Sequence, residues 1–430
     1  MKLTLLLVLG ILHVELLLAQ DWQWTTQTSG TTRSLYCVKS VDLSVGWIGG
    51  AGGVVLRTTN GGNTWTNVGG GAIGTSDVYV IDALDANTAF VSTSPAGTYI
   101  YRTTNGGTTW TQVYASPDGF IDIIHMHDSL NGIAIGDPVA GRWVILKTTN
   151  GGSSWSRIAN EPYLTGSESI WNNGATFVGN THAWFTTNTP KIYRSTNGGF
   201  EWIPIITPYT FSSIWFNDTL VGVAGTTAGR IGRSTDSGLT WRDTTLPGTG
   251  SVRSVGGTRS ARFFASRGTQ IFKSTNNGVT WTLSFGGGIG MITHMHLVQV
   301  GPFASRAWAV SSGGGVASAC FCPDLAVNEE WLPGQFALSQ NYPNPFNPST
   351  KIRYQTPEVS HVSLKVFDML GRQVRTLVNE NLQAGSYETT FSAEGGSASG
   401  GDATGLASGV YFYRLQAGEF TQTRRLLLLR

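Results

Sequence analysis

A nine-residue motif that ends in Trp occurs six times between residues 57 and 281, and it limits the possible folds more than any other feature. The first copy reads RTTNGGNTW and the fifth reads RSTDSGLTW. Successive copies are 39 to 47 residues apart. A β-patterned period of about 40 to 45 residues is the length of one four-stranded blade of a β-propeller. The copies end at Trp65, Trp110, Trp155, Trp202, Trp241 and Trp281.

Each copy has the residues of a tight turn between two strands. Asn60 can bond its own backbone two residues on, and Gly62 can adopt the positive φ that such a turn requires. The closing Trp then buries a large ring. Six copies cannot all be one catalytic site, so we expect the motif to form the fold. Its fourth position is Asn60, Asn105, Asn150, Asn197, Asp236 and Asn276.

The spacing also predicts the number of blades. Trp24 precedes Trp65 by 41 residues, which is one more blade length. Residues 282–319 contain a further apolar series without a seventh motif, and Trp22–Thr26 can supply its missing outer strand. Pairing the two ends of the array leaves few exposed edges. We therefore expect residues 20–322 to form a seven-bladed β-propeller.

The motif resembles the Asp-box, or bacterial neuraminidase repeat, with Asn in five of six copies where that family prefers Asp. The stretch GWIGGAGGVVLRTTNGGNTW resembles the propellers of the photosystem II assembly and stability factor family. That resemblance covers roughly residues 24–319 and implies a propeller fold.

Both ends of the chain have the features of export signals. Lys2 precedes an apolar run and a small residue at Ala19, which predicts a secretory signal peptide over residues 1–19. A membrane anchor is the alternative, but the run contains Glu15 and is shorter than a bilayer span. We expect no other segment to span a membrane.

The last ninety-five residues read as a second module after a linker at residues 323–335. Six or seven short strands predict a small Ig-like β-sandwich over residues 336–430. The segments NYPNPFNPST, VFDMLGRQV and ASGVYFYRL, with the basic and apolar end TRRLLLLR, resemble the C-terminal sorting domain of the type IX secretion system of Bacteroidetes-like bacteria. The resemblance implies a partnership with that machinery and export across the outer membrane, to the cell surface or the medium. A carbohydrate-binding sandwich is the alternative.

Charge and cysteine content exclude some functions. The formal net charge is +2, with 28 basic and 26 acidic residues, which argues against a nucleic-acid binder. The three cysteines allow one pair. Because the strand after Trp24 is expected beside the last blade, we expect Cys37 to pair with Cys320 or Cys322 and close the ring.

Two His-Met-His triplets are candidate metal or binding residues. Alternation along a strand places both His of a triplet on one face: His125 with His127, and His294 with His296. With Asp137 near the first triplet, they could bind a metal, but both triplets lie in the first strands of non-adjacent blades. Polar residues that pack or line the pore are therefore the expectation, with no metal and no cofactor.

Loop aromatics favour a binding protein over an enzyme. Their rings could stack on sugars or contact a partner protein. They include Tyr114, Phe120, Tyr163, Tyr209 and Trp215. The alternative is a sialidase-like glycan hydrolase, for which Glu161 and Glu168 could be the carboxylate pair. Their place in a loop between blades instead suggests solvated residues. A chaperone like the photosystem factor is a third reading, against which export argues.

Overall fold

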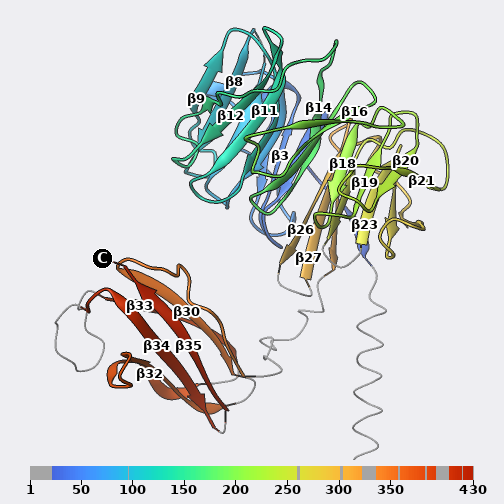
Figure 1. Cartoon of the computed structure of the whole chain (residues 1–430). Coiled ribbons are helices and arrows are strands. Elements are labelled where there is room, and N and C mark those ends of the chain that lie inside the picture. The colour runs from blue at the N-terminus through green and yellow to red at the C-terminus, as the bar shows by residue number, and fades with distance from the viewer. Residues whose placement is uncertain are drawn as a thin grey trace, which may run out of the picture. The chain divides into compact units, whose positions relative to one another are not determined.

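The computed structural model describes residues 22–94, 96–258, 262–300, 304–321, 336–356, 359–382, 385–393, 406–418 and 420–429. The predicted signal peptide and linker lie outside these residues. Chain contacts divide the molecule into one unit up to residue 323 and a second unit from residue 324 (Figure 1). Among the described residues, no helix is long and apolar enough to cross a membrane.

The described part of the first unit contains seven four-stranded antiparallel sheets and two short 3-10 helices. The helices are η1 (Ala51–Gly53) and η2 (Gly71–Ile73). The strands of the first four sheets, from the innermost outward, are β2 (Leu35–Ser40), β3 (Gly46–Gly50), β4 (Val55–Thr58) and β5 (Thr66–Asn67); β6 (Val78–Ala83), β7 (Ala89–Thr93), β8 (Thr98–Thr103) and β9 (Thr111–Ser116); β10 (Ile121–Met126), β11 (Gly132–Val139), β12 (Arg142–Thr148) and β13 (Ser156–Arg157); β14 (Ile170–Val178), β15 (His182–Thr187), β16 (Lys191–Ser195) and β17 (Ile203–Ile206). The other three sheets are β18 (Ser213–Phe216), β19 (Gly222–Gly225), β20 (Ile231–Ser234) and β21 (Arg242–Thr244); β22 (Val255–Thr258), β23 (Arg262–Arg267), β24 (Gln270–Ser274) and β25 (Thr282–Phe285); β26 (Ile292–Val300), β27 (Ala304–Ser311), β28 (Val316–Phe321) and β1 (Gln23–Gln27).

The sheets form a closed ring. The first strand of each sheet contacts the first strand of the next, in the order β2, β6, β10, β14, β18, β22, β26 and back to β2. The last sheet takes its outer strand from the other end of the array, because β1 pairs antiparallel with β28 from Gln23–Cys320 to Gln27–Val316. The pairing predicted for Trp22–Thr26 is therefore confirmed.

Apolar side chains fill the space between neighbouring sheets. Each sheet has faces on both sides to cover, so its middle strands are buried throughout, as in β3 and β7. The largest fully buried rings lie in these layers: Trp47, Trp143, Trp184 and Trp308. The outer strands are more exposed, and the apolar side chains of Ile203 and Ile206 on β17 face solvent.

The predicted disulfide of Cys37 is wrong. Cys37 is a buried free thiol, and its Sγ lies 3.7 Å from the carbonyl oxygen of Val78 in the next sheet. The strand that pairs with the last sheet is β1, whereas Cys37 belongs to the innermost strand β2 and faces the opposite neighbour. Cys320 is disulfide-bonded. Cys322 lies outside the described residues.

The second unit consists of two antiparallel sheets packed on one hydrophobic core. Leu338, Ile352 and Phe391 from the first sheet and Leu364 and Tyr413 from the second belong to the same buried cluster. The strands of the first sheet are β29 (Ala337–Leu338), β30 (Ser349–Thr356) and β33 (Gly385–Ser392). Those of the second are β32 (Gln373–Leu382), β31 (Ser360–Phe367), β34 (Gly409–Ala417) and β35 (Phe420–Leu428).

Candidate functional site

The repeat motif forms a turn whose polar groups bond one another. Asn60 Oδ1 accepts hydrogen bonds from Thr58 Oγ1 and from the backbone N–H of Thr64, both 3.0 Å long. The Asn side chain thus reaches four residues along the chain rather than the two we expected. Thr58 Oγ1 in turn accepts from the N–H of Gly62, which has a φ of 84°. These residues serve the turn, as predicted.

The turns of the motif lie at one end of the ring. The N–H of Gly61 donates to the carbonyl of Ser44, which is in the turn between β2 and β3. The N–H of Gly106 makes the same bond to Asn87 in the next sheet. The motif therefore lies at the end where the innermost strands finish, and the opposite end, where they begin, carries none of its six turns.

The histidine triplets meet at the axis. His125, His294 and His296 line one central cavity of about 130 Å³, although their strands β10 and β26 are not neighbours in the ring. Trp215 lines the same cavity, and its ring lies 6.1 Å from that of His296. His127 lies beside His125, with ring centroids 4.9 Å apart. The expected pore-lining position is confirmed for His125, His294 and His296.

The second triplet fastens the last sheet to the first. The backbone N–H groups of Val38 and Ser40 on β2 each donate to an imidazole Nδ1, that of His294 and that of His296, at 3.1 Å. Burial and the nearby Lys39 lower the pKa of His294 to about 4, so the ring is neutral. Among the described residues, no group of three or more His, Cys, Asp or Glu side chains is placed to hold a metal ion.

An ion pair lies in the lining of the same cavity. Lys39 Nζ lies 2.6 Å from Asp82 Oδ1, and it joins the innermost strands of the first two sheets. Asp82 Oδ2 also accepts a hydrogen bond of 2.7 Å from the N–H of Met126 on the third. This pair satisfies its charges within the fold, which makes it structural.

A wider hollow of about 500 Å³ lies where the innermost strands begin. All seven sheets contribute to it, each with residues at or just before the start of its first strand. We call it the cup. Its side chains include Tyr36, Tyr79, Phe120, Asp122, Asp137, Trp171, Ser212, Arg253 and Thr293.

Aromatic rings form one wall of the cup. The Tyr36 and Tyr79 rings stack with centroids 5.4 Å apart, and the Phe120 ring follows 5.0 Å from Tyr79. The hydroxyls of both Tyr36 and Tyr79 face Asp77 Oδ2, at 3.3 and 3.4 Å. Because three neighbouring sheets supply these rings from the same position, the wall is continuous and held in place.

Two carboxyl groups lie beside this wall. Asp122 is only 2% exposed, and among the described residues its Oδ2 has no hydrogen-bond partner. Burial and the neighbouring Asp137 raise the pKa of Asp122 well above its usual range. Asp137 is less buried, and its Oδ1 accepts a hydrogen bond of 2.8 Å from the N–H of Ile170. Burial also raises the pKa of Asp137.

The remaining candidate aromatics do not join the cup. Tyr114 is half-buried on the outer strand β9. Tyr163 is exposed in a loop, where the Arg142 guanidinium lies over its ring at 4.0 Å. Tyr209 has a similar cover from Arg230 at 4.7 Å. Of the loop aromatics that we singled out, Phe120 lines the cup.

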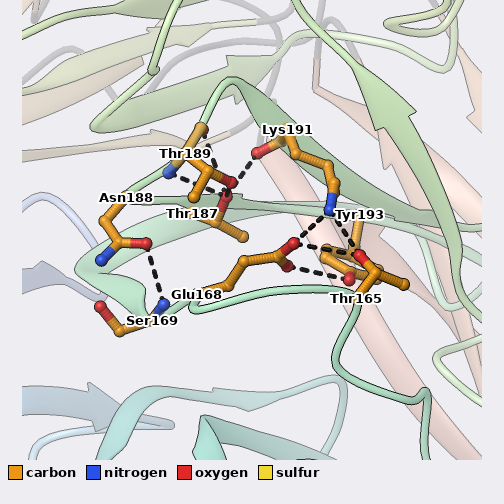
Figure 2. Close-up of polar contacts among 8 residues, drawn as sticks. All are labelled: Thr165, Glu168, Ser169, Thr187, Asn188, Thr189, Lys191 and Tyr193. Carbon is orange, nitrogen blue, oxygen red and sulfur yellow. Dashed lines mark hydrogen bonds and ion pairs between the residues drawn. The ribbon is translucent and has the colours of Figure 1, made fainter.

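We expected Glu161 and Glu168 to be solvated loop residues. This expectation is wrong, because both are buried and paired with basic groups. Glu168 forms an ion pair with Lys191 and accepts a hydrogen bond of 3.0 Å from the Tyr193 hydroxyl (Figure 2). Glu161 forms a bidentate pair with Arg157, at 2.6 Å for both bonds. Both are 7% exposed, because they lie in the connection between β13 and β14 and pair it with the two sheets that it joins.

Sequence reasoning missed most of the cup, including Tyr36, Tyr79, Asp122, Trp171 and Arg253. A signal for them exists. Each lies 12 to 16 residues after the Trp that closes the preceding repeat, or after Trp24 for the first. Aligning the repeats and comparing this five-residue window would have identified the cup residues of the separate sheets.

The ring of sheets and its axial cavity define this unit as a β-propeller. Residues 19–137 match the family model of the photosynthesis system II assembly factor YCF48, and residues 340–428 match that of the secretion system C-terminal sorting domain. The second match indicates sorting by the type IX secretion system and export across the outer membrane. No curated protein matches the chain.

Solved structures agree on the fold. YCF48 from Cyanidioschyzon merolae is 17% identical, with a TM-score of 0.56, over 69% of this chain and 98% of that one. A structure of YCF48 bound to D1 peptide is 14% identical, with a TM-score of 0.56, over 72% of this chain and 98% of that one. The structural similarity establishes a shared propeller fold, as the resemblance in the sequence implied. At identities this low, it establishes the fold alone.

Proposed function

We propose that this chain is an exported, non-catalytic binding protein that holds a segment of another polypeptide in the cup. In this proposal residues 20–322 are a seven-bladed propeller. An N-terminal signal peptide and an Ig-like sorting module at residues 336–430 bring it to the cell surface or the medium. The seven four-stranded sheets in a closed ring support the blade count. The two-sheet core of the second unit supports the sandwich.

The cup carries the proposal. It is a concave site on the axis to which every sheet contributes, with an aromatic wall and charged groups of both signs. Pockets that bind ligands combine apolar walls with a few placed polar groups. A polypeptide is favoured over a glycan because a structural neighbour, YCF48, has been solved with a peptide bound.

Charge pairing argues against the alternative, a sialidase-like glycan hydrolase. Glycoside hydrolysis requires two carboxyl groups that flank the scissile bond. Glu161 and Glu168 are each held in a buried ion pair outside the cup. Of the two carboxyl groups in the cup, Asp122 is 2% exposed, which leaves Asp137 as the one within reach of a substrate.

Selection from a random peptide library on the full chain, without its predicted signal peptide, tests the proposal. The control is the variant Trp171→Ala, which removes one ring from the cup. We expect enriched peptides that bind the wild type and lose at least about tenfold in affinity on the variant. Peptides that bind both proteins equally would place the site elsewhere. An empty selection together with hits on a glycan array would favour the glycan.

A further inference from the structure

We propose that the cup recognises an organic ammonium group, such as a lysine side chain or a free amino terminus, which binds Asp137 among the aromatic rings. This inference rests on the proposed binding function and names the chemistry that the ligand must present. The geometry of the two carboxyl groups and of the rings beside them carries it.

Within the described part of the chain, the two carboxyl groups of the cup have no cationic partner. Among the described residues, neither Asp122 nor Asp137 forms an ion pair, whereas Asp82, Glu161 and Glu168 each have a basic partner. Asp122 and Asp137 lie on the paired strands β10 and β11, whose register brings Ile121 opposite Gly136. Burying two neighbouring carboxyl groups without a counter-charge is costly, so a cation from outside would stabilise them.

The two groups are placed for different roles. Asp137 is partly exposed, and among the described residues its carboxylate accepts one hydrogen bond, from the Ile170 N–H to Oδ1. Its second oxygen can therefore contact a ligand. Asp122 is more deeply buried, and its Oδ2 has no hydrogen-bond partner among the described residues. Burial and Asp137 raise the pKa of this carboxyl, and an ammonium group bound beside it would favour its charged form and so place a second negative charge beneath the site. Two adjacent carboxyl groups attract a cation more strongly than one.

The walls distinguish an organic cation from a metal ion. Calcium takes six to eight oxygen ligands, and magnesium requires a near-octahedral set. Rings line the same cup as these carboxyl groups: Phe120 is two residues before Asp122 in the chain, and Trp171 follows the residue whose N–H bonds Asp137. Aromatic faces attract alkylammonium groups through cation–π interactions, and aromatic cages bind such groups in proteins.

Arg253 does not neutralise the acidic side. It comes just before β22, whose sheet lies three places around the ring from the sheet of β10. Its Nε donates to the hydroxyl of Ser251 at 3.3 Å. The cup therefore has a positive rim across the axis from its acidic wall, so a ligand held there would direct its ammonium group away from Arg253.

Ligand-observed NMR on the full chain without its predicted signal peptide tests the inference. Nα-acetyl-lysine N-methylamide carries the side-chain amine alone, and alanine N-methylamide carries the α-amine alone, so these probes separate the two sources. The neutral matched probe is Nα-acetyl-norleucine N-methylamide. We expect saturable millimolar binding of at least one amine and at least about tenfold weaker binding of the norleucine probe.

Three variants locate the binding. Asp137→Asn and Asp122→Asn should each weaken the amine at least about tenfold. Asp122→Asn replaces an unpaired buried acid with a neutral group of the same shape, so its melting temperature should not fall, and it reports binding rather than folding. Asp118→Asn removes the same charge from an exposed loop residue outside the cup and should change nothing.

Equal binding of the lysine and norleucine probes would overturn the inference, as would no amine binding or displacement of the amine by CaCl₂. The peptide selection separates this failure from failure of the proposed function. Selected peptides could require Trp171 for binding and still bind after every amine is replaced by a neutral group. This result would support the proposed binding function and contradict the ammonium site.

Discussion

His294 Nδ1 accepts a hydrogen bond from the backbone N–H of Val38, a residue 256 positions earlier in the chain, at 3.1 Å. His296 repeats the contact with Ser40, two residues further along each strand. The two innermost strands at the closure of the ring are thus joined by a ladder of imidazoles. An acceptor is required at each rung, which only a deprotonated Nδ1 provides.

Acid should therefore loosen the closure of the ring. The pKa of His294 is about 4 in the folded protein, below the value of about 6.5 in an unfolded chain. Between these two pH values the unfolded state binds more protons, so stability is complete above about pH 6.5 and falls towards pH 4. The expected loss from this residue is on the order of 3 kcal/mol. Denaturant unfolding of the propeller unit as a function of pH measures it.

The control is His294→Asn, whose side-chain oxygen can still accept from Val38 but does not titrate. Its stability should fall less steeply over this range. His125 and His296, whose pKa values are also lowered by burial and Lys39, will contribute the slope that remains. The same slope in wild type and variant would contradict the assignment. Among the described residues, Lys39, Asp82 and Arg253 are the other charged groups that line this cavity.

Lys39→Met should be strongly destabilising. It leaves the Asp82 carboxylate, whose side chain is 3% exposed, without its basic partner, at a cost of about 3–5 kcal/mol. Lys39→Met combined with Asp82→Asn should recover part of the loss, because Asn keeps an acceptor for the Met126 N–H. Arg230→Met, from the exposed pair with Asp243, should cost less than about 1 kcal/mol. Urea unfolding measures the loss of stability in each variant. A loss in Lys39→Met as small as that in Arg230→Met would show that the Lys39–Asp82 pair is dispensable.

The one acidic copy of the repeat motif should tolerate the residue of the other five. Asp236 Oδ1 accepts from Ser234 Oγ and from the Thr240 N–H, at 2.8 and 2.9 Å. Asp236→Asn keeps both bonds and should stay within about 0.5 kcal/mol at pH 7, whereas Asp236→Ala should cost about 1–2 kcal/mol. Thermal unfolding compares them. A loss in Asn as large as that in Ala would mean that the charge matters more than the turn bonds.

Glu168 should prove structural. Glu168→Gln leaves the Lys191 ammonium without its charge partner in the cluster of Figure 2, and the expected loss is about 3 kcal/mol. Glu201→Gln is the matched control. Glu201 is exposed and accepts one hydrogen bond from Asn197, so the change should stay within about 0.5 kcal/mol. Stable folding of Glu168→Gln would reopen a catalytic role for this carboxylate.

The architecture was well predicted from the sequence because the repeat has the length of one four-stranded sheet. The motif predicts each turn, and its Trp gives the period of the repeat. The strand at Trp24, which precedes the first repeat, pairs with β28. Three of the four histidines of the triplets, His125, His294 and His296, line the axial cavity as expected, because the first strand of each repeat is the innermost one. Local pattern and period suffice for all of these.

The prediction failed where the answer depends on which side of a sheet a residue faces. The chain closes through β1, so Cys37 on β2 faces the next sheet rather than Cys320. Glu161 and Glu168 lie in a loop, as expected, but they are buried in ion pairs with Arg157 and Lys191 rather than solvated. The cup is assembled from single positions on separate repeats, and no local motif marks it.

Binding of a polypeptide in the cup can be tested by the indole N–H resonance of Trp171 in a ¹⁵N-labelled full chain, which is assigned by its absence in Trp171→Phe. Its Nε1 has no hydrogen-bond partner among the described residues and belongs to a side chain that lines the cup, so a ligand seated there must perturb it. On addition of a selected peptide, we expect the Trp171 signal to shift while that of Trp241, from a repeat motif, stays in place. A peptide that binds and leaves the Trp171 signal unshifted would contradict binding in the cup.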